Sequence, residues 1–474
     1  MPIYFFKFYI SGMIHAGIGP THVNAFLSSV NIPPIARNTL KRREREIGPA
    51  IERVAKKSCT DAYWEECGFS DKNIAVSYDM GWQKRGKGYN SLTGVGHMIG
   101  FNSKRIVGYQ TRNKRCSICY IASKNGRKPR RHDCRKNWCG SSKSMEPDVA
   151  VELAKEFKDR GFPIGSLIGD DDATTIKKLR EEVDDKIVKE SDIIHTKRSL
   201  NTQLHELKKN NKELTEPVIQ HICKCFAYAV TQNVGNVTGI KDALATIIPH
   251  CYGEHDKCGD WCGFTKDASS YKRKGFKGDL QDNDTRQALD STMKTFIDNA
   301  EKFAGALNSQ SNEAFNQTIA SKALKCRHYG SSESNDYRVA AAVCQKNVGR
   351  TYVANVYQDV SLSPGNFTIL NGHKVDNEAV ESVTKRSQKS SKLRRIELKK
   401  EKASKRNTAA IREGISYEKD IGYSQEVDTE EIPPPTTMPS LETIDVEESG
   451  ETLVIFDVET TCAGNDYFVN KDQD

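Results

Sequence analysis

A short apolar stretch that runs into three acids, and then into a helical pattern, constrains the fold of this chain most strongly. Residues 166–180 read SLIGDDDATTIKKLR, so the apolar run ends at Gly169 and is followed directly by Asp170, Asp171 and Asp172. A strand that ends in a carboxylate and leads into a helix is how α/β folds present acids to a metal ion. The alternative is a solvated turn in which an Asp caps the helix. The choice between them depends on partners elsewhere in the chain.

A second strand that ends in an acid is expected earlier in the chain. Residues 74–78, IAVSY, are apolar and rich in β-forming residues, and they run straight into Asp79. After a turn that contains several glycines come two more strand-like runs, GHMIGF and RIVGYQT. A strand that ends in an acid and continues into a meander is typical of the start of an RNase H-like domain. The sequence therefore predicts an α/β fold with an RNase H-like core.

A third acid, Glu313, lies in a segment with a helical pattern. It follows Asn312 and precedes Asn316 by three residues, so Glu313 and Asn316 share a helical face. Alone it is an ordinary helical Glu, but with Asp79 and one of the acids at 170–172 it forms an Asp–Asp–Glu set. Three carboxylates can hold two divalent ions about 4 Å apart, which activate water or a 3′-hydroxyl at a phosphodiester. Mg²⁺ prefers such oxygen ligands, and Mn²⁺ is the alternative.

Closely spaced cysteines and histidines between the first two acids predict a zinc site. Cys116 and Cys119 are separated by two residues, and His132 and Cys134 by one. Four soft ligands on two tight turns suit tetrahedral Zn²⁺. Cys139 could replace His132 in the set. We expect the metal to be structural, because it would fix a small basic loop that cannot build its own core.

A second group of the same kind lies further along, in PHCYGEHDKCGDWC. We choose His250, His255, Cys258 and Cys262 as its ligands and again expect structural Zn²⁺. The chain has 14 cysteines, several of them two or three residues apart or next to histidines. This usage favours metal binding in a reducing compartment over a disulfide scaffold.

Positive charge is concentrated in two segments. Residues 104–136 contain twelve basic residues and one acid, and residues 385–406 contain eleven basic residues and two acids. Residues 407–474 have the opposite character, with three basic and seventeen acidic residues. A basic stretch within a folded region indicates a polyanion such as nucleic acid. The run at 385–406 is either a solvated linker or a patch for nuclear import or nucleic-acid binding.

Other segments carry weaker indications. Residues 20–58 predict two helices around a break at Pro33 and Pro34, which form either a DNA-binding helix-turn-helix or a plain helical hairpin. His195 precedes a basic helical run and is either a phosphate contact near the acids or a structural histidine. No run approaches the roughly 18 apolar residues that a membrane span needs, so we expect no membrane partner.

The chain resembles the Mutator-like transposases of animal genomes over roughly residues 74–345. The following stretches carry the resemblance: SYDMGWQKRGKGYNSLTG, RNKRCSIC, HDCRKNW with GSSKSMEPD after it, GDDDATTIKKL, IIHTKRSL and SQSNEAFNQTIASKALKCRHYGSSES. The resemblance implies that Asp79, Asp170 and Glu313 are the catalytic acids of a DDE transposase with an RNase H-like core. It also implies a helical insertion between the second and third acids, which are separated by 142 residues. Related sequences often read GDGDS where this chain reads GDDDA, which makes Asp172 the alternative second ligand.

The end of the chain resembles a different family. The stretch LVIFDVETT is similar to the first motif of DEDD-type 3′–5′ exonucleases, with Asp457 and Glu459 as its two acids. Two carboxylates one residue apart on a strand share a face and can bridge two metal ions. The later two acids of that family are missing, so we expect this segment to be an inactive fragment.

Together these features predict a transposase that cuts double-stranded transposon ends and joins them to target DNA, in the nucleus, as a homodimer or higher oligomer. The alternatives are a domesticated, non-catalytic DNA-binding protein and a fragment of an exonuclease fusion. The expected parts are a helical region at 1–70, the transposase domain at 71–350 with a zinc loop at about 112–140 and an insertion at about 200–300, a basic then acidic and largely disordered linker at 351–450, and an incomplete exonuclease-like segment at 451–474.

Overall fold

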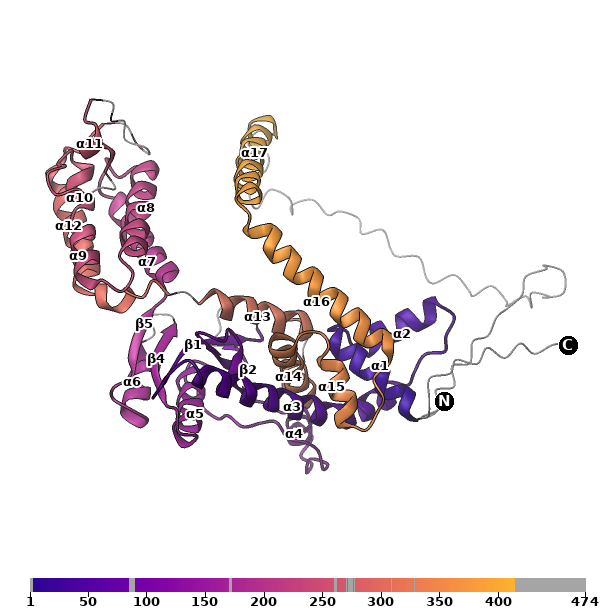
Figure 1. Ribbon diagram of the computed structural model, residues 1–474. Coiled ribbons are helices and arrows are strands. Elements are labelled where there is room, and N and C mark those ends of the chain that lie inside the picture. The colour runs from indigo at the N-terminus through magenta and orange to yellow at the C-terminus, as the bar shows by residue number, and fades with distance from the viewer. Residues whose placement is uncertain are drawn as a thin grey trace. The chain divides into compact units, whose positions relative to one another are not determined.

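The computed structural model describes residues 3–84, 90–169, 173–259, 262–269, 271, 276, 278–307, 309–327 and 329–413. The chain divides into two compact units, residues 1–373 and residues 374–474. The first unit contains the sheet and most of the helices (Figure 1).

The sheet of the first unit is mixed. Five strands in the described part of the chain pair in the order β3–β2–β1–β4–β5. The central strand β1 pairs antiparallel with β2 and parallel with β4, β2 pairs antiparallel with β3, and β4 pairs parallel with β5. Their bounds are β1 Ile74–Trp82, β2 Thr93–Gly100, β3 Ile106–Asn113, β4 Ile164–Gly169 and β5 Val188–Ser191. The predicted α/β architecture, including the two strands that lead into Asp79 and Asp170, is therefore present.

Alternating residues of β1 separate the two faces of the sheet. Val76, Tyr78 and Met80 enter one apolar core with residues of α5 (Met145–Asp159) and α6 (Ala173–Glu182). Because successive strand side chains point to opposite faces, Ser77 and Asp79 face the other side. That side is covered by α3 (Arg37–Cys67), α13 (Gln310–Lys322) and α14 (Glu333–Val348), which pack against β1, β2 and β3.

The N-terminal helices pack into a second apolar core, which lies on the side of the sheet covered by α13 and α14. As the sequence predicted, the break at Pro33 and Pro34 separates α2 (Pro20–Ser29) from α3. Inside α3, a Cβ at Gly48 would lie 2.3 Å from the ring of Tyr337, so the glycine allows α14 to approach closely. α1 (Ile3–His15) and α15 (Tyr352–Asp359) pack on α3, and α4 (Ser117–Lys124) follows β3.

Between β5 and α13 the chain forms a helical insertion with its own core. Leu200, Phe226 and Leu289 are among its buried residues. It consists of α7 (Ile193–Lys208), α8 (Glu216–Gln232), α9 (Val237–Ala245), α10 (Ile247–Cys251), α11 (Gly263–Lys266), α12 (Asn283–Asp298) and the short helix η2 (Ala300–Phe303). The separate core explains why this segment can be long without interrupting the sheet.

The second unit begins within a long helix. α16 (Asn366–Ser387) crosses the boundary between the units, and α17 (Lys389–Glu413) follows after one residue. The sequence predicted a largely disordered linker at 351–450, but α15 lies in the core of the first unit, and α16 and α17 are helical through Glu413. Lys, Arg, Glu and Ala are good helix formers, and pairs such as Glu381 with Lys385 add support at i,i+4. Asp457 and Glu459 lie outside the described residues.

None of the helices in the described ranges combines the length and the apolar character that crossing a bilayer would require.

Candidate functional site

The strand β1 presents Asp79 to helix α13, and hydrogen bonds orient its carboxylate. Asn316 donates from Nδ2 to Asp79 Oδ2 at 2.6 Å, and the backbone N–H of Met80 donates to Asp79 Oδ1 at 2.7 Å. β1 continues to Trp82, so Asp79 lies within the strand and not at its end as the sequence predicted, and its side chain is half-buried. The first predicted acid is therefore tied to the helix that carries the third.

A second asparagine, one helical turn earlier on α13, also donates a hydrogen bond to β1. Asn312, which is fully buried, donates from Nδ2 to Ser77 Oγ at 2.8 Å. Strand residues two apart are separated by about 6.6 Å and helical residues four apart by about 6 Å along their axes, so the two pairs match in spacing. A Cβ at Gly81 would lie 2.4 Å from Asn316 Oδ1, so the absence of a side chain at Gly81 lets Asn316 approach β1.

Glu313 lies between these two asparagines in the first turn of α13. Its side chain is 52% exposed, and its Oε1 lies 3.9 Å from His195 Nε2 and 3.9 Å from Arg198 Nη1, both on α7. The structure thus brings His195 next to Glu313, as one of the two interpretations of that histidine required. At 3.9 Å both contacts are long, so they leave the carboxylate room to move.

The second predicted acid cannot be placed in the same way. Asp170, Asp171 and Asp172 lie outside the described residues, which resume at Ala173 with helix α6. The strand that leads to them is described, and its last residue, Gly169, is close to β1. A Cβ at Gly169 would lie 3.0 Å from the carbonyl oxygen of Tyr78 and 3.4 Å from Lys189 Nζ. The end of β4 is therefore packed against the residue that precedes Asp79.

Asp192 joins the two ends of the insertion. Its Oδ2 accepts hydrogen bonds from the backbone N–H of Ser309 at 2.7 Å and from Ser309 Oγ at 2.5 Å, while Oδ1 caps α7. Burial opposes ionisation of this carboxyl, but the hydrogen bonds from Ser309 and from the start of α7 outweigh it and lower the pKa of Asp192. Because Ser309 immediately precedes α13, Asp192 fixes the start of the helix that carries Glu313.

A buried histidine that the sequence analysis did not single out lies beside Asp79. His97 on β2 is the cross-strand partner of Asp79, is fully buried, and packs against Phe315 of α13 with ring centroids 4.7 Å apart. Burial lowers the pKa of His97 to about 3, so the ring is neutral at physiological pH. Its sequence context, one histidine in the strand GHMIGF, gave no indication of this position.

The first cysteine and histidine group is assembled around α4. The ligand atoms of Cys116, Cys119, His132 and Cys134 all lie within 4.8 Å of one another. His132 Nε2 is 3.2 Å from Cys116 Sγ and 3.4 Å from Cys119 Sγ, close to the roughly 3.5 Å expected for tetrahedral zinc ligands. The other ring nitrogen, Nδ1, lies 2.7 Å from the carbonyl of Arg130, an arrangement that directs Nε2 to a metal. Cys139 is exposed and lies outside this group.

One arginine links the loop of this group to the core. Arg135 lies one residue beyond Cys134 and forms ion pairs with Glu52 of α3, at 2.6 Å, and with Asp336 of α14, at 3.5 Å. Asp336 is itself buried, which raises its pKa to about 6 despite the opposing effect of Arg135. The position of the loop is therefore fixed by charges on two helices of the core.

The second group lies in the insertion, between α10 and α11. The ligand atoms of His250, His255, Cys258 and Cys262 also lie within 4.8 Å of one another. Cys258 Sγ is 3.5 Å from His250 Nδ1, and Cys262 Sγ is 3.5 Å from His255 Nδ1. Burial and the nearby Cys262 thiol raise the pKa of Cys258 to about 12, so thiolates here require a compensating cation.

Aromatic rings surround this second group. The ring of His255 stacks on Phe264 with centroids 4.1 Å apart, and the hydroxyl of Tyr271 lies 3.3 Å from His250 Nε2. Both histidines are buried, at 3% and 8% exposure. Each group thus has the donor set, the spacing and the surroundings of a zinc site.

A family model described as Mutator-like transposase matches residues 8–262. The match includes Asp79, the segment 170–172 and both cysteine and histidine groups, and Glu313 lies beyond it. No curated protein matches the chain.

Proposed function

Because the chain belongs to the Mutator-like transposase family, we propose that it cuts and joins DNA by two-metal-ion catalysis at Asp79, Asp170 and Glu313. The observation that carries this proposal is the pair of asparagines on α13. They connect the strand of Asp79 with the helix of Glu313 across more than two hundred residues of sequence. A solvated turn or an ordinary helical Glu would not require this contact.

We further propose that the sheet is an RNase H-like core. The support is its topology: β1 lies at the centre, β2 and β3 form an antiparallel meander on one side, and β4 and β5 run parallel to β1 on the other. In such a sheet an acid on β1 and an acid after β4 emerge at the same edge, because β1 and β4 are parallel.

Between the two candidates for the second acid we favour Asp170 over Asp172. Ser77 pairs with Ile168, and Asp79 and Asp170 each follow two residues later. Consecutive Cα atoms are about 3.8 Å apart, so Asp170 is the acid that the chain reaches first from Gly169. Asp172 precedes α6 and suits an N-cap.

The side chains around these acids would have different roles in binding the metal ions and the DNA. When bound, two Mg²⁺ or Mn²⁺ ions would activate the attacking oxygen and stabilise the leaving oxygen of the phosphodiester. Asn316 and the Met80 N–H orient the Asp79 carboxylate, which has about four lone-pair sites and can bind a cation as well. His195 and Arg198 lie beside Glu313 and can contact a phosphate of the DNA.

We propose structural Zn²⁺ at both cysteine and histidine groups. The support is the ligand spacing and the contacts of His132 and His250 through their second ring nitrogens. The first site fixes a loop on which basic residues are exposed. These residues are Lys124, Arg127, Lys128, Arg130 and Arg131.

This loop supports double-stranded DNA as the partner, because exposed Lys and Arg side chains provide the phosphate contacts that position a duplex. We propose a nuclear location, because the proposed substrate is genomic DNA. Cutting and joining both transposon ends is most simply done by a homodimer or a higher oligomer.

The proposal is tested by a strand-transfer assay on purified full-length protein with Mg²⁺. Asp79→Asn and Glu313→Gln should each abolish cleavage and joining while DNA binding remains. Glu181→Gln, which changes an exposed carboxylate on α6, is the matched control and should retain activity. If Asp79→Asn and Glu313→Gln cut as well as the control, the catalytic assignment is wrong. If no form cuts but all bind DNA, the chain is a non-catalytic DNA-binding protein.

A further inference from the structure

Helix α17 in the second unit carries a row of basic residues along one side. Lys392, Arg395, Lys399 and Lys402 recur at i, i+3, i+7 and i+10, which places them along one side of a helix with 3.6 residues per turn. We call these four residues the basic stripe. All four are exposed.

Two of the three acids in this helix lie on the opposite side. Glu397 and Glu401 are four residues apart and lie roughly 160° around the helix from the centre of the basic stripe. A helix that is charged only for solubility intersperses both signs and forms i,i+4 pairs between them. Within the described residues, Lys392, Lys399 and Lys402 have no carboxylate partner, whereas Lys385 on α16 pairs with Glu381 at 3.4 Å. The charge of the stripe is therefore available to a partner.

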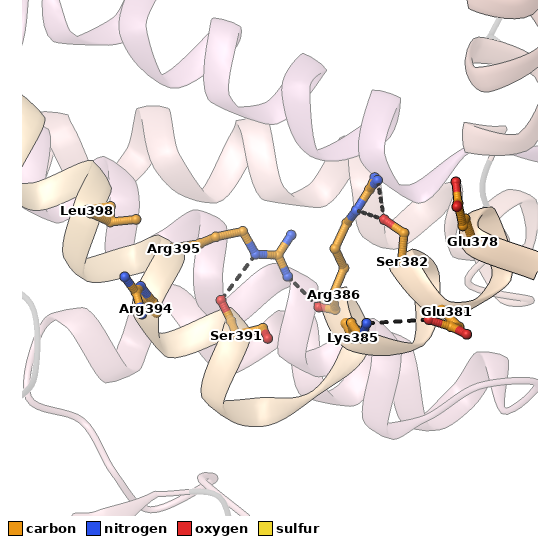
Figure 2. Close-up of a pocket in the computed structure, with 9 residues that line it drawn as sticks. All are labelled: Glu378, Glu381, Ser382, Lys385, Arg386, Ser391, Arg394, Arg395 and Leu398. Atoms are coloured by element: carbon orange, nitrogen blue, oxygen red, sulfur yellow. Dashed lines mark hydrogen bonds and ion pairs between the residues drawn. The ribbon is translucent and has the colours of Figure 1, made fainter. Parts of the chain in front are cut away.

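The stripe starts at an elbow between α16 and α17. Figure 2 shows Arg395 donating to the backbone carbonyls of Arg386, at 2.6 Å, and Ser391, at 3.3 Å. These bonds join the end of α16 to the first turns of α17. The concave side of the elbow is a hollow of about 560 Å³ lined by charged residues of both signs, among them Glu378, Glu381 and Lys385. The elbow thus holds the start of the stripe in a fixed orientation.

We propose that the basic stripe binds the phosphate backbone of double-stranded DNA without reading its sequence. The four residues span about 15 Å of helix axis. Phosphates of one strand follow at about 3.4 Å along a duplex, so four charges face a run of about four phosphates. An acidic protein is the less suitable partner, because stable protein interfaces have apolar or aromatic anchors at their centre and the stripe contains none. The inference rests on the proposed DNA substrate but not on the catalytic acids.

The test compares two triple variants of the full-length protein with equal changes of charge. Lys392/Lys399/Lys402→Gln removes three members of the stripe. Lys389/Arg394/Lys400→Gln removes three exposed basic residues of α17 that lie at other angles. Binding to a random-sequence duplex is measured by fluorescence anisotropy over a series of NaCl concentrations, without Mg²⁺. Circular dichroism checks that α17 remains helical in both.

The stripe variant should lose about tenfold or more in affinity at low salt, and the slope of log K against log salt should decrease by about 2 to 3, since each phosphate contact contributes about 0.9. The control should change the slope by less than about 1. Equal losses in both variants would overturn the proposal, because net charge alone would then explain them. Unchanged affinity in the stripe variant would also overturn it and leave this face to an acidic protein. Asp79→Asn in the strand-transfer assay, with its DNA binding measured by anisotropy beside the stripe variant, separates the two proposals, since it removes cleavage and leaves the stripe intact.

Discussion

At the scale of single residues, two asparagine side chains connect the strand that carries Asp79 with the helix that carries Glu313. Asn316 contacts Asp79, and Asn312 contacts Ser77, while Glu313 lies between them on the same helix. Catalytic groups must be held within fractions of an ångström, so the residues that orient them affect the rate without touching the substrate. Asn316 is therefore a positioning residue whose effect can be measured.

Asn316→Leu removes the donor to Asp79 and nearly conserves the side-chain volume. We expect strand transfer to slow by about 10- to 100-fold, because a carboxylate displaced by about 1 Å can cost this much. Affinity for Mn²⁺, measured by calorimetry, should also fall, which a purely structural role would not require. Gln317→Leu on the exposed side of α13 is the control. Equal behaviour of the two variants would show that Asn316 does not position Asp79.

Lys322 gives a prediction about pH. It is 2% exposed and donates from Nζ to the carbonyl of His15 at 2.8 Å, and burial lowers its pKa to about 8. The unfolded chain keeps this proton until about pH 10.4, so between pH 8 and about 10.4 the unfolded state binds more protons. The free energy of unfolding should therefore rise with pH across this window, by roughly 3 kcal/mol in total from this group.

Lys322→Met removes the titrating group and keeps the shape of the side chain. Urea unfolding at pH 7.5 and at pH 10 should show that the wild type gains stability relative to this variant at the higher pH. If the free energy of unfolding changes by the same amount between pH 7.5 and pH 10 in both proteins, Lys322 is not buried as described.

At the scale of elements, the insertion and the sheet meet at Asp192. Its carboxylate holds both the start of α7 and the residue before α13. Asp192→Ala leaves the backbone N–H of Ser309 without its partner, and an unmade buried hydrogen bond to a charged group costs about 1.5 to 3 kcal/mol. We expect a lower melting temperature and a loss of strand transfer larger than the loss of DNA binding. Asp192→Asn should restore part of both, and a fully active Asp192→Ala would contradict the positioning role.

The proposed zinc site in the loop after α4 gives a second prediction at this scale. Cys119→Ser should lower the zinc content, measured by mass spectrometry, from two ions per chain to one, and should destabilise the loop. Cys139→Ser is the matched control, because Cys139 is an exposed thiol of the same loop outside the ligand group. A loss of zinc in Cys139→Ser with none in Cys119→Ser would reverse the assignment of ligands.

At the scale of the whole molecule, the N-terminal helices are part of the core. Arg338 of α14 is fully buried and donates to the carbonyls of Ile18 and Lys322, each at 2.7 Å. Ile10 and Leu27 are buried in the same apolar core as α3 and α14. These contacts make residues 20–58 core helices rather than a separate domain.

Deleting residues 1–35 should therefore destabilise the first unit. Each large buried apolar side chain contributes about 1.5 to 3 kcal/mol, and the deletion also leaves Arg338 without an acceptor at Ile18. The truncated protein should be insoluble or melt at a much lower temperature in a thermal-shift assay. A truncated protein that melts like the full chain would show that the N-terminal region is separable.

The sequence by itself determined the elements and the chemistry of their ends. The β-forming run at 74–78 predicts a strand, the apolar run before Gly169 predicts another, and the spacing of cysteines and histidines predicts each ligand group. These are local patterns, in which side-chain period and residue type act over a few residues. The same reasoning misjudged residues 366–413, because charge alone was taken to favour disorder although the residues favour a helix.

Only the tertiary structure decided which distant residues meet. Nothing near Asn316 in the sequence indicates that it bonds to Asp79, or that Gly81 makes room for it. The roles of Asp192 at the base of the insertion and of Arg135 between α3 and α14 likewise appear only in the fold. The reason is physical: such contacts depend on how helices dock on a sheet, and docking is fixed by packing of the whole core rather than by local pattern. The strand that ends at Gly169 was recognisable from sequence, but its position beside Tyr78 next to Asp79 required the sheet.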